Sequence, residues 1–155
     1  MIFLQETKCS SLKIKGISKN IGKRMNYTEV EGNGLVGGLA TFWNPHSIHL
    51  ISDEATRSYI SLEVQIIGEA STYVCTNVYN PQKLEDKLLM LNRLSEMHQR
   101  HLAAKAIYGG YFNMITTLAE KKGGIRTLNR DTEAFNNFIQ EAKLVEILPK
   151  NGMYI

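Results

Sequence analysis

The spacing of hydrophobic residues along this chain changes at Pro81, from every second position to every third or fourth. Before Pro81, short apolar runs between turn residues predict strands, and in residues 59–67 the apolar positions 60, 62, 64 and 66 alternate with mostly polar ones. After Pro81, apolar residues recur every three or four positions and predict a helix that ends near residue 101: Leu84, Leu88, Leu91, Leu94 and Met97. Strands and amphipathic helices in one chain predict a mixed α/β domain with a largely antiparallel sheet.

The remaining elements follow from the same two patterns. We expect further strands at residues 2–4, 27–30, 35–43, 48–51, 72–78 and 103–108, with 144–148 as a last short candidate. The first strand is apolar throughout and is therefore expected to have neighbours on both sides. Asn33-Gly34 favours a tight hairpin turn. A helix with a basic outer face is expected within residues 8–24, and a last helix from Asn129 or Asp131, both good N-cap residues.

The composition is that of one folded domain. The 155 residues, of which 43% are hydrophobic and 21% charged, are enough to bury a core of ordinary size, and the net charge of +3 is too small to predict a nucleic-acid partner by itself. Cys9 and Cys75 cannot form the disulfide framework of a small secreted domain. The apolar start is too short for a signal peptide, and no apolar run approaches the ~20 residues of a membrane span. We therefore expect a globular intracellular protein without a membrane partner.

Several motifs have simple structural explanations. Residues 32–37 spell the dinucleotide fingerprint G-x-G-x-x-G, but a strand-like run follows where a nucleotide site needs a helix, so we expect a hairpin and no nucleotide cofactor. His98 and His101 make only half of a zinc site. The basic run within 8–24 is more often a solvated helix face than a phosphate contact. A second basic group lies in a glycine-containing loop that suits contacts with a phosphate substrate: Lys121, Lys122, Arg126 and Arg130.

Three short motifs place polar side chains at the predicted ends of strands. The motif LQET at residues 4–7 puts a carboxylate after the first strand, NVYNP at 77–81 ends another strand, and GGYFN at 109–113 ends a third. Domains with α/β architecture commonly build their sites where polar groups meet at adjacent strand ends. Together, the three motifs predict one functional site.

These motifs resemble those of the endonuclease/exonuclease/phosphatase (DNase I-like) family, and most closely the endonuclease domain of plant LINE-type retrotransposons. Further segments extend the likeness over essentially the whole chain: IFLQETKCS, GGLATFWNP, EKKGG and AFNNFIQEAKLVEILPKNGMY. The resemblance implies a four-layer α/β sandwich with mostly antiparallel sheets, Mg²⁺ as cofactor and hydrolysis of phosphodiester bonds in DNA. It also implies three roles, with Glu6 as the metal carboxylate, Tyr79 as the tyrosine beside the phosphate and Asn113 as an amide near the scissile phosphate.

The chain also departs from the family pattern. Tyr111 stands where the family has the aspartate that orients or deprotonates the attacking water. A phenol with an ordinary pKa near 10 is neutral at pH 7 and cannot replace a carboxylate base, and loss of a positioned base typically costs ~10²–10⁴ in rate. The family's first strand is expected before Met1, and its closing strands with an Asp/His pair after Ile155. We therefore expect residues 1–155 to be a partial domain, truncated at both ends.

Four hypotheses follow for the function. The favoured one is a retroelement-derived remnant, in the nucleus or cytoplasm, that keeps weak affinity for DNA and has lost or crippled hydrolysis. The alternatives are an active Mg²⁺-dependent endonuclease, a small-molecule phosphatase on the same fold, and a purely structural interaction domain. Binding to DNA that weakens as salt rises would distinguish the remnant from the structural domain.

Overall fold

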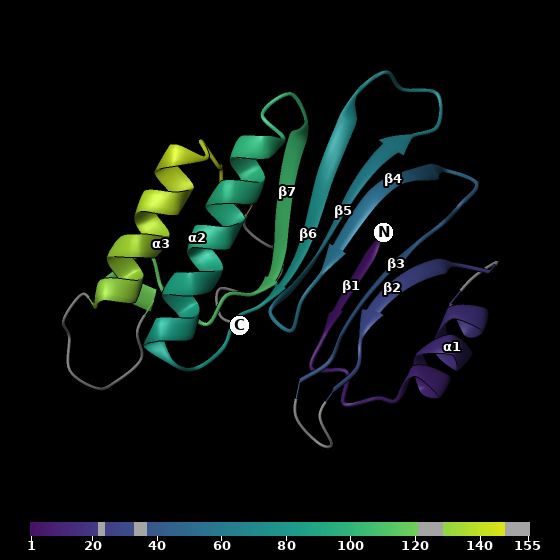
Figure 1. Cartoon of the computed structure of the whole chain (residues 1–155), viewed down its shortest axis with the longest axis horizontal. Helices are drawn as coiled ribbons and strands as arrows, with labels where there is room; N and C mark the ends of the chain where they lie inside the picture. The colour runs from purple at the N-terminus through teal and green to yellow at the C-terminus, as the bar shows by residue number, and fades with distance from the viewer. Residues whose placement is uncertain (22–23, 33–36, 121–128, 148–155) are drawn as a thin grey trace.

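The structure, a computed structural model, describes residues 1–21, 24–32, 37–120 and 129–147 (Figure 1). In chain order its elements are β1 (Ile2–Gln5), α1 (Ser11–Asn20), β2 (Asn26–Val30), β3 (Leu39–Trp43), β4 (Ile48–Ala55), β5 (Tyr59–Ile66), β6 (Thr72–Tyr79), α2 (Leu84–Arg100), β7 (Lys105–Tyr111), a short 3-10 helix (Leu118–Glu120) and α3 (Arg130–Glu141). The strands form two sheets, with orders β1-β3-β2 and β4-β5-β6-β7. Every pairing is antiparallel except that of β6 with β7, which confirms the predicted mixed α/β class.

Three buried clusters show that the elements stack in four layers. One cluster joins Ile14 of α1 to Ala40 and Phe42 on the outer face of the first sheet. A second fills the space between the two sheets, with side chains from β3, β5 and β6. The third packs α2 and α3 against the outer face of the second sheet. The order helix, sheet, sheet, helices is the expected four-layer α/β sandwich (Figure 1).

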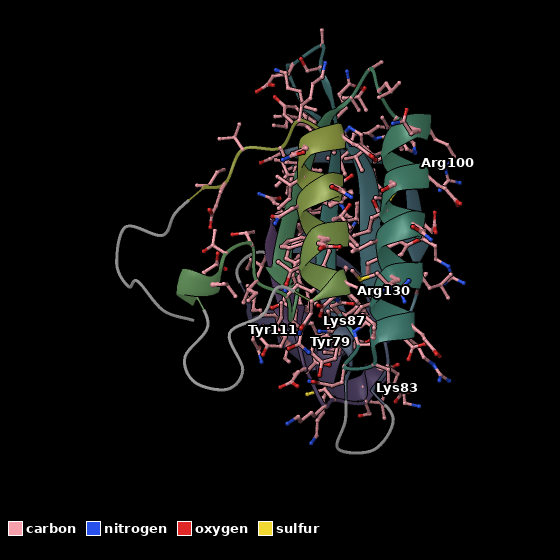
Figure 2. The ribbon with its side chains drawn as sticks, turned by 90° about the vertical axis from the view of Figure 1, so that its left-hand side faces the viewer. Tyr79, Lys83, Lys87, Arg100, Tyr111 and Arg130 are labelled. Carbon is pink, nitrogen blue, oxygen red and sulfur yellow. The ribbon has the colours of Figure 1, made fainter. Side chains whose placement is uncertain are left out.

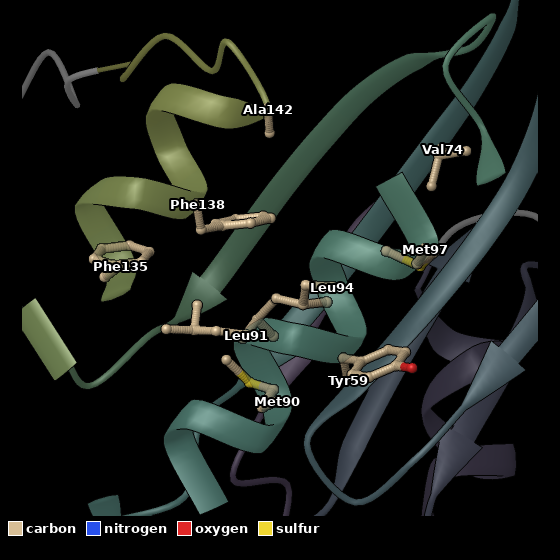
Figure 3. Close-up of a cluster of buried hydrophobic side chains, with 10 residues drawn as sticks. Tyr59, Val74, Met90, Leu91, Leu94, Met97, Phe135, Phe138 and Ala142 are labelled. Atoms are coloured by element: carbon tan, nitrogen blue, oxygen red, sulfur yellow. The ribbon is translucent and has the colours of Figure 1, made fainter. Parts of the chain in front are cut away.

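The third cluster explains the apolar stripe after Pro81. Leu91, Leu94 and Met97 of the predicted stripe are buried there, together with Met90. Figure 3 shows these side chains of α2 gathered with Phe135 and Phe138 of α3 and with Tyr59 and Val74 of the sheet. The first residue of the stripe, Leu84, is 40% exposed at the start of the helix, where it lines a surface pocket.

The helix expected within 8–24 is confirmed as α1, but three other expectations need correction. Residues 144–147 are not a strand, and Leu148 lies outside the described part. The first strand has one neighbour, β3, rather than two among the described residues. The strand expected at 48–51 continues to Ala55, since it pairs with β5 along its whole length.

The described helices contain no segment long and apolar enough to cross a membrane.

Candidate functional site

The three strand-end motifs meet at one end of the sandwich. The hydroxyl of Tyr79, the last residue of β6, donates a hydrogen bond of 2.5 Å to Oε1 of Glu6, which follows β1. Tyr79 is the register partner of Tyr111 at the end of β7, and their rings are stacked with centroids 6.3 Å apart. Figure 2 shows both tyrosines at the same end of the molecule. The structure thus brings together three of the residues that the sequence predicts for the site.

A pair of glycines allows β1 to come this close to β7. A Cβ on Gly109 would lie 3.1 Å from Cδ2 of Phe3 on β1. Gly110 has a φ of +125°, and a Cβ there would overlap the carbonyl oxygen of Val78 and lie 3.0 Å from Nε2 of Gln5. Because side chains at both positions would push β1 away, the Gly-Gly dipeptide is what lets Glu6 reach the ends of β6 and β7.

Asn77 links the two sheets through hydrogen bonds directly beneath the site. It is fully buried, and its Oδ1 accepts a hydrogen bond of 2.5 Å from Nε2 of Gln5. Its Nδ2 lies 3.1–3.2 Å from three acceptors in the first sheet, which are the carbonyl oxygens of Leu4 and Ala40 and Oγ1 of Thr41. The sequence placed Asn77 in a strand-end motif without giving it a role. One feature of the sequence could have pointed to Asn77. It is an amide on a predicted strand, two residues before Tyr79 and therefore on the same face of β6.

The turn after β7 is held through its carbonyl groups. Asn80 donates from its backbone N–H to the carbonyl oxygen of Tyr111 at 2.9 Å and from its Nδ2 to that of Phe112 at 2.6 Å. Lys87 donates from Nζ to the carbonyl oxygen of Asn113 at 2.8 Å. Three consecutive carbonyls are therefore fixed by two residues, Asn80 directly after β6 and Lys87 on α2. Asn113 itself adopts a left-handed φ of 56°, and its buried Nδ2 has no acceptor among the described residues.

Lys87 is held in turn by Asp131 in the first turn of α3. Their charged groups are 2.9 Å apart, and their side chains are only 12% and 15% exposed. Burial by itself raises the pKa of Asp131, but the hydrogen bond and the charge of Lys87 outweigh it and leave that pKa below its usual range. Of the two predicted N-cap residues, Asn129 occupies the N-cap position and Asp131 makes this ion pair instead.

The contact between Tyr79 and Glu6 fixes the protonation of the phenol. The hydrogen bond to Glu6, followed by burial and by the charge of Glu6, raises the pKa of Tyr79 above its ordinary value. Tyr79 is therefore a hydrogen-bond donor at neutral pH and not a base. Glu6 is exposed and uses one carboxylate oxygen for Tyr79, which leaves its other oxygen for a ligand.

The strand ends offer few protein ligands for a metal ion such as Mg²⁺. Among the described residues no group of three or more His, Cys, Asp or Glu side chains could hold a metal ion. Mg²⁺ is commonly bound through only one or two carboxylates, with phosphate oxygens and several waters completing its shell. Glu6, with one free oxygen at an exposed strand end, fits a Mg²⁺ that is shared with a phosphate ligand.

Basic side chains and a pocket flank the strand ends. Lys83, Lys87 and Arg130 lie at the same end of the molecule as the two tyrosines (Figure 2). A surface pocket of about 440 Å³ opens there, where α2 and α3 begin, and is lined by Gln82, Leu84, Lys87, Asn129, Arg130 and Asp131. Three of the residues predicted to contact phosphate lie outside the described part of the chain: Lys121, Lys122 and Arg126.

The other sequence motifs do not contribute to the site. The strand β3, rather than a helix, follows the G-x-G-x-x-G motif, and the predicted turn at Asn33-Gly34 lies outside the described part of the chain. The two histidines contact different residues, with Nδ1 of His98 3.3 Å from the hydroxyl of Tyr108 and Nδ1 of His101 3.7 Å from Glu63.

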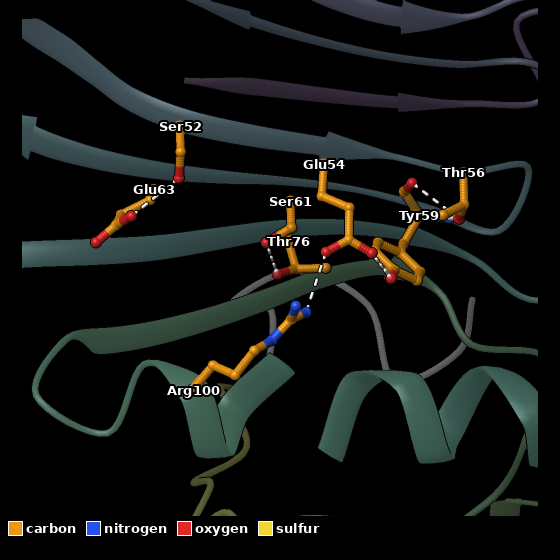
Figure 4. A network of polar contacts seen from close by, with 8 residues as sticks. All are labelled: Ser52, Glu54, Thr56, Tyr59, Ser61, Glu63, Thr76 and Arg100. Carbon is orange, nitrogen blue, oxygen red and sulfur yellow. Dashed lines mark hydrogen bonds and ion pairs between the residues drawn. The ribbon is translucent and has the colours of Figure 1, made fainter. Parts of the chain in front are cut away.

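A separate polar network covers part of the outer face of the second sheet (Figure 4). Glu54 accepts hydrogen bonds from the hydroxyl of Tyr59 and from Nη2 of Arg100, the latter at 3.1 Å. Ser61 and Thr76 share a buried hydrogen bond of 3.0 Å nearby. Arg100 is the last residue of α2, at the opposite end of that helix from the site (Figure 2).

Comparison with known proteins identifies the fold. No protein-family model matches the chain, and no match was found among curated proteins. Among solved structures, a humanized D. rerio TDP2 with 14 mutations has 12% sequence identity and a TM-score of 0.54, over 72% of this chain and 51% of that one. D. rerio TDP2 complexed with a single-strand DNA product has 14% identity and a TM-score of 0.51, over 72% and 46% of the two chains. The human Nocturnin catalytic domain with a bound sulfate anion has 17% identity and a TM-score of 0.51, over 72% and 50%.

The chain therefore spans about half of the length of these solved structures. At such low identity the likeness concerns the fold and not the activity. The two sheets and their flanking helices match the architecture of these structures: this chain has the DNase I-like fold.

Proposed function

We propose that this chain is a retroelement-derived DNase I-like domain that binds DNA phosphates with Mg²⁺ and hydrolyses phosphodiester bonds slowly or not at all. One observation carries the proposal. At the strand ends, the carboxylate of Glu6 accepts a hydrogen bond from one of two stacked phenol rings, and the other ring belongs to Tyr111. The family resemblance aligns Tyr111 with the catalytic aspartate. The retroelement origin rests on the resemblance of the motifs to plant LINE-type endonuclease domains.

Each residue of the site has its own proposed role in binding DNA. Glu6 would hold Mg²⁺ through the oxygen that Tyr79 leaves free. A bound Mg²⁺ supplies neutralisation of the phosphate charge. The family resemblance gives Asn113 the role of an amide near the phosphate, and its Nδ2 has no acceptor among the described residues. Lys83 and Arg130 at the same end would attract the DNA backbone.

The same residues lack a base for hydrolysis. Tyr79 is kept protonated by its hydrogen bond to Glu6, and Glu6 is committed to that bond and to the metal. A positioned general base contributes ~10²–10⁴ in rate, so its loss leaves binding intact and slows the chemistry. DNA as the ligand is also supported by the solved D. rerio TDP2, which is complexed with a single-strand DNA product.

Incubation of the folded chain with supercoiled plasmid tests this proposal. We expect Mg²⁺-dependent binding of the plasmid, with nicking no faster than in EDTA, and loss of the Mg²⁺-dependent binding in Glu6→Ala. Glu96→Ala, an exposed glutamate in the middle of α2, is the matched control and should behave as the wild type. Circular dichroism establishes that each variant is folded.

Two results would contradict the proposal. Rapid nicking by the wild type that disappears both in EDTA and in Glu6→Ala would make the chain an active endonuclease. A folded chain that binds no plasmid with Mg²⁺ at low salt would leave only the DNase I-like scaffold.

A further inference from the structure

The ring of Tyr111 is an aromatic surface that core packing does not explain. Tyr111 is 45% exposed, although its neighbour Phe112 packs into the core with its ring 5.1 Å from that of Phe135. The Tyr111 ring stacks on Tyr79 at an interplanar angle of 25°, and Tyr79 in turn bonds to Glu6. An exposed ring is thus placed beside the carboxylate that is proposed to hold the phosphate-bound metal.

The backbone that carries this ring is fixed on both sides. Tyr111 pairs with Tyr79 in the parallel ladder, and its carbonyl oxygen accepts from the backbone N–H of Asn80 at 2.9 Å. The next two carbonyls are held by Asn80 and Lys87. A ring that is already oriented loses little conformational freedom when a second ring stacks on it.

We propose that Tyr111 is a stacking platform for an unpaired nucleobase, and that the preferred ligand of the site is therefore single-stranded DNA. This inference rests on the proposed function, because the base is brought to the ring by the phosphate bound at Glu6. Every base offers a flat face to a tyrosine, whereas bases within a duplex are already stacked on one another. The substitution that removes the catalytic carboxylate thus adds a contact to the DNA base.

Fluorescence anisotropy with labelled 15-nucleotide DNA in Mg²⁺ tests this inference. We expect the wild type to bind the single strand at least about tenfold more tightly than the duplex. Tyr111→Leu is expected to lose about tenfold in affinity for the single strand and to keep its affinity for the duplex, whereas Tyr111→Phe should keep both. Ile107→Ala is the matched control, because Ile107 is also 45% exposed and lies on the same face of β7.

An abasic single strand of the same length separates the base contact from the phosphate contact. If the abasic strand and the ordinary strand bind equally tightly, stacking is wrong while phosphate binding stands. Equal losses for single strand and duplex in Tyr111→Leu, or no loss at all, would also overturn the inference. If none of the three DNAs binds to the folded chain, the proposed function fails and the inference fails with it.

Discussion

Replacing Tyr111 with aspartate is expected to raise the rate of Mg²⁺-dependent plasmid nicking by about 10²-fold or more. The new carboxylate would stand at the end of β7, beside Tyr79, whose hydroxyl bonds to Glu6. At neutral pH it is ionised and can take a proton from a water that attacks the phosphate, which the phenol cannot do. The rate of conversion of supercoiled to open-circular plasmid, measured at saturating protein, reports the gain.

Tyr111→Asn is the control for this prediction. It has nearly the same shape as Tyr111→Asp and also removes the bulky ring, but it supplies no base. We expect it to nick no faster than the wild type. If the asparagine variant gains as much as the aspartate variant, the ring of Tyr111 acts by excluding water, and the missing base is not what limits hydrolysis.

Lys87→Met is expected to lower the free energy of unfolding by about 3 kcal/mol. The substitution leaves Asp131, which is 15% exposed, without its cation, and it leaves the carbonyl oxygen of Asn113 without a donor. Arg100→Met removes the other Lys/Arg ion pair seen in the described residues, Arg100 with Glu54, whose side chains are 60% and 45% exposed (Figure 4). Because water screens that pair, its loss should cost less than about 1 kcal/mol. Urea denaturation at pH 7 measures the decrease in free energy of unfolding for both variants.

The loss of unfolding free energy in Lys87→Met should depend on pH, because the pKa of Asp131 is lowered in the folded protein. A carboxyl whose pKa is lower in the folded state stabilises the protein above its unfolded pKa of about 3.9, and this stabilisation is lost as the pH falls through the folded value. The difference in free energy of unfolding between the wild type and Lys87→Met should therefore be constant from about pH 7 to 5 and shrink below about pH 4. A difference that stays constant down to pH 2 would show that Lys87 stabilises the fold without its charge.

The sequence anticipates the site where the chain brings residues together through regular strands. The motifs at 4–7, 77–81 and 109–113 end three strands, and such strand ends meet once the sheets pack, so Glu6, Tyr79 and Tyr111 could be predicted to be neighbours. The four layers were implied by the family resemblance. The spacing of hydrophobic residues by itself indicated only the strands and helices, and not how they stack into four layers.

The supporting residues could not be predicted in the same way. The bonds of Asn77 span 36 to 73 positions along the chain, and the pair of Lys87 with Asp131 spans 44. No local pattern encodes such contacts, because they depend on how β1 crosses β6 and on how α2 meets α3.

The most direct test of the account is the effect of Mg²⁺ on the affinity for single-stranded DNA, measured by anisotropy on the wild type and on Glu6→Gln. Glutamine keeps the size of the side chain and can still accept a hydrogen bond from Tyr79, but it removes the charge that would hold the metal. The account predicts that Mg²⁺ strengthens binding by the wild type and not by Glu6→Gln, while both bind equally in EDTA. An equal gain with Mg²⁺ in both proteins would show that Glu6 is not the metal ligand, and would contradict the account.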